Sequence, residues 1–264
     1  MKQDAKKSLS RRIAGLVLLK IIPAVLLVYL LVFTGVYVFS VKHKLKQLHQ
    51  TYAPGGDSLS YSAEEWNLIR QKSLLNARVK MSDSDSIGMT INFGDSLVQL
   101  EMKGVVLRQT KFDEAEISRF FRSIHPAAYE KFFSNPFSIT EIEGSIVKEP
   151  ITVKKAPKDS LEAAQNITVT DTSRVKEFIE WHFQLDSTFI VSFVQSDRQF
   201  GKTDWSTIQY RLRRHSKKLK EINQALLSFR MPAYYPEITV FIPKNEAKSF
   251  FRALPQSGLV SLKF

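Results

Sequence analysis

Ser96 is the residue whose neighbours most suggest a nucleophile, because it stands in the tetrapeptide Gly94-Asp95-Ser96-Leu97. A catalytic serine needs a nearby base, most often histidine, that accepts the hydroxyl proton. The chain has 5 histidines, at positions 43, 49, 125, 182 and 215, and none has an aspartate three residues before it. A Gly-Asp pair between two alternating apolar runs is also an ordinary hairpin turn. We therefore assign no catalytic residue and keep Ser96 as the candidate.

Two short segments are similar to enzyme families. Gly94-Asp95-Ser96-Leu97 resembles the nucleophile block of GDSL esterases, which implies Ser96 as the nucleophile, but the late Asp-x-x-His and the Gly-x-Asn-Asp block of that family do not occur. Residues 246–260, from Glu246-Ala247-Lys248 through Leu254-Pro255 to Val260, resemble the closing helix and strand of bacterial L,D-transpeptidases. The catalytic His and the Ser-x-Gly-Cys-x-Arg block of the transpeptidases are absent. Neither resemblance implies a complete site.

Metal and cofactor sites lack the residues they need. Asp83-x-Asp85 followed by Gly88 is similar to the start of a calcium loop, but the fifth position is Ile87 and the twelfth is Gly94, where a bidentate glutamate is required. The chain has no cysteine, which excludes disulfides, thiolate metal sites and cysteine nucleophiles. We expect no metal and no cofactor.

A basic run in the last third of the chain is the strongest local charge signal outside the N-terminal region. Six fixed positive charges fall within ten residues with no acid among them: Arg211, Arg213, Arg214, Lys217, Lys218 and Lys220. On a helix these side chains would spread around most of the circumference. They could form a solvated face, or they could bind an acidic protein, anionic lipid headgroups or an anionic wall polymer. We predict these six as the binding residues.

The longest apolar segment runs from Ile21 to Phe39 and contains no charged residue. A helix of this length rises roughly 28 Å, close to the roughly 30 Å hydrocarbon core of a bilayer. A cleaved signal peptide would have a shorter apolar region that ends in a small-residue site, whereas this run continues through Phe39 to Lys42. We therefore predict an uncleaved transmembrane helix that contacts the lipid bilayer.

The distribution of charge indicates the orientation of this helix. The formal charge is +12, of which residues 1–46 carry +8, so most of the basic excess flanks the apolar segment and no nucleic-acid partner is expected. More of these charges precede the segment than follow it. The positive-inside rule then places the N-terminus in the cytoplasm and the C-terminal body in the periplasm, with the helix in the inner membrane. In this respect the chain is similar to single-pass envelope proteins of Gram-negative bacteria.

The remainder of the chain predicts an α+β fold with a mixed sheet, possibly in two small subdomains. We divide the chain into a basic cytoplasmic segment 1–20, the span 21–39, a stalk 40–56, a subdomain 57–147, a linker 148–166 and a basic subdomain 167–264. Apolar spacing predicts helices over 63–79, 113–124, 213–229 and 245–254. Period-two alternation predicts a meander over 87–112 and strands over 137–147, 176–185, 188–195, 205–212, 236–243 and 258–264. The final strand, helix and strand predict either a parallel crossover or a split mixed sheet.

These observations favour a function by contact. We expect a membrane-anchored periplasmic interaction or scaffolding protein of the cell envelope that is not an enzyme. Two alternatives remain open: an envelope hydrolase acting on wall or lipid through Ser96 or through a carboxylate pair, and a ligand-binding ectodomain.

Overall fold

The structure is a computed structural model that describes residues 2–52, 61–148, 178–197, 205–228 and 230–264, with side chains in the first helix described at 23, 24 and from 27 onward. Residues 53–56 of the predicted stalk and nearly all of the predicted linker 148–166 lie outside the described residues.

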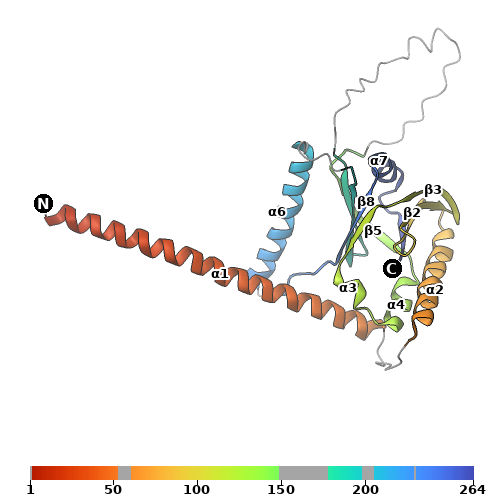
Figure 1. Ribbon diagram of the computed structural model, residues 1–264, viewed down its shortest axis with the longest axis horizontal. Helices are drawn as coiled ribbons and strands as arrows, with labels where there is room; N and C mark the ends of the chain where they lie inside the picture. The colour runs from red at the N-terminus through yellow and green to blue at the C-terminus, as the bar shows by residue number, and fades with distance from the viewer. Residues whose placement is uncertain (1, 53–60, 149–177, 198–204, 229) are drawn as a thin grey trace, which may run out of the picture.

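The first helix, α1 (Lys2–Tyr52), extends far from the folded body (Figure 1). It contains the predicted span 21–39 and continues into the predicted stalk as far as Tyr52. Within the part of the chain that the structure describes, α1 is the one helix long and apolar enough to cross a membrane, over Leu27–Tyr52, and a signal sequence near the N-terminus would pass the same test. Its last turns belong to the body, because Leu48 is buried in the main core.

Helix α2 (Ala63–Ser82) and the following meander agree with the sequence prediction. The Ser62 hydroxyl accepts the N–H of Glu65 at 3.2 Å, and the Glu65 carboxylate accepts the N–H of Ser62 at 2.7 Å, which completes the capping box. Strands β1 (Gly88–Asn92), β2 (Leu97–Met102) and β3 (Val105–Lys111) pair antiparallel in that order.

The other elements complete an α+β body. They are β4 (Glu114–Ile117), α3 (Arg119–Arg122), α4 (Pro126–Phe133), β5 (Phe137–Gly144), β6 (Glu180–Leu185), β7 (Phe189–Gln195), α6 (Trp205–Leu227), β8 (Glu237–Ile242), α7 (Lys244–Ala253) and β9 (Leu259–Lys263). Among the described residues all nine strands form one sheet, in the order β3-β2-β1-β9-β5-β6-β7-β8-β4.

The sheet joins strands from both halves of the chain. The last strand, β9, lies between β1 and β5, parallel to β1 and antiparallel to β5. Three strands separate β8 from β9, and the pairings between them make β9 antiparallel to β8, so the final strand, helix and strand do not form a parallel crossover and the mixed-sheet alternative is the one observed. The division into subdomains 57–147 and 167–264 stays a prediction, but both ranges contribute strands to this sheet.

Two of the predicted elements are wrong. Residues 113–124 are not one helix, because Glu114–Ile117 pair with β8 as an edge strand and only Arg119–Arg122 are helical. Residues 205–212 are not a strand, because α6 begins at Trp205 and continues to Leu227. In the first case pairing with β8 overrides the local helix preference, and in the second the alternation of Ile208, Tyr210 and Leu212 is also compatible with a helix.

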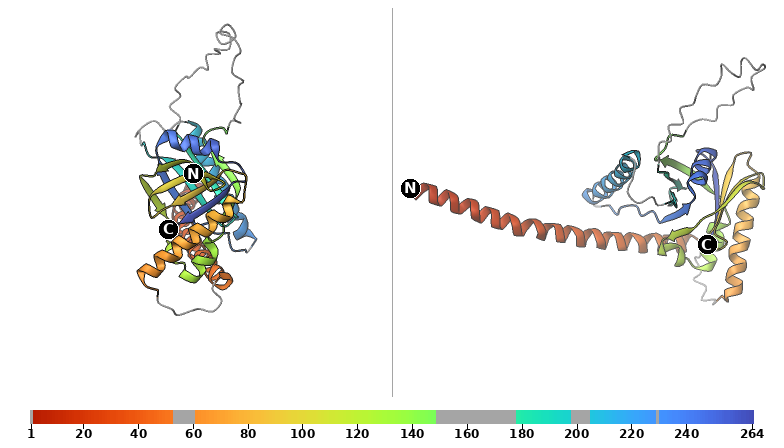
Figure 2. Two further views of the ribbon diagram at one scale, coloured as in Figure 1. Left: turned by 90° about the vertical axis from the view of Figure 1, so that its right-hand side faces the viewer. Right: turned by 45° about the horizontal axis from the view of Figure 1, so that its top comes forward.

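The two faces of the strands β5 to β8 differ in character. One face is aromatic and aliphatic: the Trp181 and Phe193 rings stack at 4.4 Å, and the Trp181 indole N–H donates to the Ala247 carbonyl of α7 at 3.0 Å. The other face carries polar side chains and is crossed by α6, which Figures 1 and 2 show standing between this sheet and the N-terminal half of α1.

Candidate functional site

Ser96 lies in the turn between β1 and β2. Its φ of 53° is in the left-handed region, and its carbonyl accepts the N–H of Phe112 at 3.0 Å. The side-chain oxygen of Asn92 accepts the N–H groups of Gly94 and Asp95 at 3.1 and 3.2 Å, which closes the turn. Three histidines have described hydrogen bonds, all to other groups: His49, His125 and His182. The Gly-Asp sequence therefore forms a hairpin turn.

The two aspartates of the calcium-like sequence make different contacts. Asp83 is the C-cap of α2, and the Asp85 carboxylate lies 2.5 Å from the Lys103 ammonium. Across the described residues, no group of three or more His, Asp or Glu side chains is placed to hold a metal ion.

Four carboxylates lie on the polar face of the sheet beneath α6: Glu141 and Glu143 on β5, Glu180 on β6 and Glu237 on β8. We call them the sheet carboxylates. Four of the six predicted binding residues pair with them: Arg211, Arg214, Lys217 and Lys218. The cations of α6 and the acids of the sheet are therefore equal in number where the two elements face each other.

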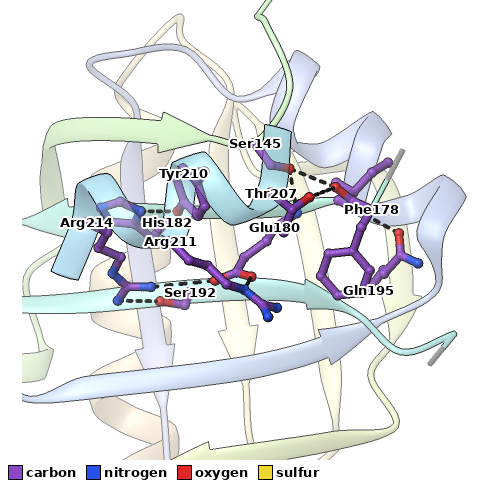
Figure 3. Close-up of polar contacts among 11 residues, drawn as sticks. Ser145, Phe178, Glu180, His182, Ser192, Gln195, Thr207, Tyr210, Arg211 and Arg214 are labelled. Carbon is purple, nitrogen blue, oxygen red and sulfur yellow. Dashed lines mark hydrogen bonds and ion pairs between the residues drawn. The ribbon is translucent and has the colours of Figure 1, made fainter. Parts of the chain in front are cut away.

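The ion pairs between α6 and the sheet are close, and Figure 3 shows those made by Arg211 and Arg214. Arg211 Nε donates to Glu180 Oε2 at 2.7 Å, and Lys217 Nζ donates to Glu141 Oε1 at 2.6 Å. Lys218 Nζ donates to Glu237 Oε1 at 2.8 Å. Arg214 donates to the Ser192 hydroxyl at 3.1 Å and lies 3.8 Å from Glu237. These contacts attach α6 to the sheet through charge instead of apolar packing.

The start of α6 is fixed by uncharged hydrogen bonds. The Thr207 hydroxyl donates to the Phe178 carbonyl at 3.2 Å, and the Ser145 hydroxyl donates to the same carbonyl at 2.9 Å (Figure 3). The Ser145 oxygen also accepts the N–H of Glu180 at 3.0 Å. These bonds connect α6 to the ends of β5 and β6.

Arg213 and Lys220 differ from the other four predicted binding residues. Both are exposed, and neither has an acidic partner among the residues that the structure describes. The six residues therefore divide into four that face the sheet and two that face solvent. Binding of a partner by the six residues stays a prediction. Among the described residues, only Arg213 and Lys220 of the six have no acidic partner.

His182 and Tyr210 form a buried polar contact between β6 and α6. The His182 Nδ1 and the Tyr210 hydroxyl are hydrogen-bonded, and both side chains are buried. Burial, followed by the charge of Arg214, lowers the pKa of His182 to about 4. Burial also raises the pKa of the Tyr210 phenol. Both groups are neutral at pH 7, and a histidine with so low a pKa, already bonded to Tyr210, is a weak general base.

The charged groups of these pairs also shift the pKa values of their partners. The hydrogen bond from Lys217 lowers the pKa of Glu141 and raises the pKa of Lys217 itself. Burial alone would raise the pKa of Glu237, but the hydrogen bond and charge of Lys218, together with Arg214, hold it below its ordinary value. Glu141, Lys217 and Glu237 are therefore ionised at neutral pH.

A cavity of about 370 Å³ lies between α1, α6 and the polar face of the sheet. Its apolar lining comes from α1, β7 and α6: Phe33, Val36, Ile190, Ile222 and Leu226. Its polar lining comes from the sheet and α6: Glu141, His182, Gln184, Arg214, Lys217 and Glu237. Such a cavity fits an amphiphile, with a polar group near the sheet and an apolar part near α1.

Sequence reasoning identified the cations of this site and missed its other half. The signal was present in β6, where Glu180, His182 and Gln184 alternate with the buried Trp181 and Phe183. A strand with one apolar and one charged face predicts a charged neighbour, and the basic run 211–220 is the nearest candidate in the sequence. Ser96 is not among the residues that line the cavity.

No known protein family, curated protein or solved structure matches this chain.

Proposed function

We propose that the chain is a single-pass protein of the bacterial inner membrane, with its N-terminus in the cytoplasm and its body in the periplasm, and that it acts as a non-catalytic interaction or scaffolding component of the cell envelope. The apolar surface of α1 supports the membrane placement, since Leu27, Leu31 and Phe39 are exposed on an otherwise bare helix. The charge bias of residues 1–46 supports the orientation.

The observation that carries the interaction function is the edge strand β3. Val105 is 63% and Leu107 50% exposed, and Val106 on the opposite face is also exposed. The first three residues of this edge strand, Val105–Leu107, are thus apolar and exposed, and an edge strand with unpaired backbone groups is a template for another strand. The opposite edge, β4, is short and carries Glu114 and Glu116, which oppose such pairing. The two edges thus provide a test and its control within one sheet.

Photo-crosslinking in living cells tests this function. A photoreactive phenylalanine analogue at Val106 or Leu107 should give a discrete adduct, and the same analogue at Glu116 on β4 should give none. Val105→Asp should remove the adduct formed at Leu107. Equal labelling at both edges, or none at β3, would refute the interaction proposal.

Protease accessibility tests the topology separately. Protease added to intact spheroplasts should digest the body. Survival of the body until lysis would place it in the cytoplasm and refute the proposed orientation.

A second function, ligand binding, is favoured by the cavity between α1, α6 and the sheet. An amphiphile could enter it from the bilayer beside Phe33 and Val36. Val36→Trp should fill the cavity, and Val38→Trp, on the exposed side of the same helix, is the matched control. Protein extracted in native membrane discs and examined by mass spectrometry should release a bound amphiphile from the control and not from the filled variant.

The hydrolase alternative has less support. Its candidate nucleophile, Ser96, forms part of a hairpin turn outside the cavity lining. The sheet carboxylates are engaged with α6 cations, which leaves them poorly placed as a free acid and base pair.

A further inference from the structure

Helix α6 has an apolar stripe on the side that faces away from the sheet. Trp205, Leu212 and Leu219 repeat every seven residues and are 66%, 61% and 49% exposed. Residues spaced by seven lie on nearly the same side of an α-helix. Tyr210, Arg214 and Lys217, which contact the sheet, occupy the opposite side. We call the three exposed residues the outer stripe.

The end of α6 is attached to the apolar part of α1. The Tyr29 hydroxyl donates to the side-chain oxygen of Asn223 at 3.1 Å. About two turns further along α1, the Tyr37 ring packs edge-on against Tyr234, in the segment after α6, with ring centroids 5.3 Å apart. Figure 1 shows one end of α6 next to the middle of α1, the rest of α6 standing away from α1, and the N-terminal half of α1 on the side of α6 that is opposite the sheet.

This attachment determines the depth of α6 if α1 spans a bilayer. Tyr29, which contacts α6, and Tyr37, which contacts the segment after it, both lie within the predicted span 21–39, ten and two residues before Phe39. At 1.5 Å per residue these two contacts lie roughly 15 Å and 3 Å inside the outer end of the span, so they bracket its outer half. Helices that lie in the membrane interface bury their apolar face to about 5–10 Å.

The charges of α6 fit the same position. Arg213 and Lys220, the two cations without an acidic partner among the described residues, flank the outer stripe on one side. The other four cations of the basic run face the sheet carboxylates. A helix with an exposed Trp and Leu stripe bordered by free cations is typical of a surface that binds anionic lipid.

We infer that α6 is an interfacial helix whose outer stripe of Trp205, Leu212 and Leu219 inserts into the outer leaflet of the membrane that α1 spans, with Arg213 and Lys220 at the lipid phosphates. This inference rests on the proposed membrane anchor and adds a second contact with the same bilayer. The anchor and α6 together fix the body against the membrane with the cavity at the lipid boundary.

Because the natural chain has no cysteine, single labelled cysteines can test this inference in the full-length protein. An environment-sensitive dye is placed at Leu212→Cys or Leu219→Cys, and the protein is reconstituted in vesicles of phosphatidylcholine and phosphatidylglycerol that contain spin-labelled lipid. Leu31→Cys on the exposed side of α1 reports on the anchor. Leu75→Cys is the matched control, an exposed leucine on α2, which Figure 1 shows at the far end of the body.

The dye at 212 and 219 should shift to the blue and be quenched by the spin-labelled lipid, as at 31, whereas the dye at 75 should remain water-like. Arg213→Gln with Lys220→Gln should reduce the quenching at 212 and leave that at 31 unchanged. Quenching at 31 without quenching at 212 and 219 would overturn the interfacial helix and leave the anchor standing. Absence of quenching at 31 would refute the anchor itself. A blue shift at 212 that depends on protein concentration, without lipid quenching, would assign the stripe to a second copy of the chain and overturn the inference.

Discussion

The imidazole of His182 and the phenol of Tyr210 meet under α6, where both side chains are buried and each supplies the other with a hydrogen-bond partner. Charged groups face this pair from every side: Glu141 from β5, Glu237 from β8, and Arg214 and Lys217 from α6. We therefore expect the stability of the packing between α6 and the sheet to depend on pH.

Stability should fall in mild acid because of His182. Its folded-state pKa is about 4 and its ordinary value is 6.5, so the contribution of the neutral form is fully present above pH 6.5 and is lost as the pH falls through 4. The loss amounts to about 3 kcal/mol when complete. His182→Gln can still bond to Tyr210 but takes no proton, so the difference between the two proteins in urea-unfolding free energy should shrink or reverse from pH 7 to pH 4. Parallel curves would show that another group is responsible.

Glu180→Gln should loosen α6. The Glu180 side chain is 9% exposed and its partner Arg211 is 43% exposed, so the arginine can turn to water and the loss should be about 1–2 kcal/mol. Hydrogen exchange along α6 should accelerate more than exchange in β1 and β2. The control is Lys72→Gln, which breaks the exposed pair with Glu130 and should change stability by no more than about 0.5 kcal/mol. Equal effects of the two substitutions would contradict the conclusion that ion pairs attach α6 to the sheet.

The sequence predicted those elements whose signal is local. The Gly-Asp turn and the meander over 87–112 depend on neighbours within a few residues, and both are found where they were predicted. The segment 113–124 was mispredicted because its strand, β4, forms only by pairing with β8, over 120 residues later. A single sequence carries no direct information about that partner.

The candidate site was half predictable for the same reason. The cations of 211–220 are adjacent in the sequence, so they form a visible cluster. Their acidic partners come from three strands that are neighbours only in the folded sheet, and the cavity wall comes from α1. The seven-residue spacing of Trp205, Leu212 and Leu219 was also present in the sequence. The wrong prediction of a strand over 205–212 prevented its interpretation as one side of a helix. Correcting that one element reveals both faces of α6.

Gly144→Ala should destabilise the apolar side of the sheet. A Cβ at this position would lie 2.8 Å from Phe251 Cζ and 3.1 Å from Trp181 Cβ, and both rings are buried. Because these side chains have little room to move, overpacking should cost about 1–3 kcal/mol in unfolding free energy. Gly94→Ala in the exposed hairpin turn, where the nearest atom would be 3.4 Å away, is the control. If Gly144→Ala leaves the unfolding free energy unchanged, the aromatic side chains around this position can move more easily than their burial implies.

The joint between α1 and the body should be as stable as the core, because Leu48 is 5% exposed within it and Tyr52 packs edge-on against Phe132 at 5.3 Å. Leu48→Ala should therefore cost about 2–4 kcal/mol in the unfolding free energy of the full-length protein. Lys46→Ala, exposed on the same helix, should change it by less than about 0.5 kcal/mol. If Leu48→Ala were as mild as Lys46→Ala, the end of α1 would be a loose tether. The position of α6 relative to the membrane would then depend on the Tyr29–Asn223 and Tyr37–Tyr234 contacts instead of on this joint.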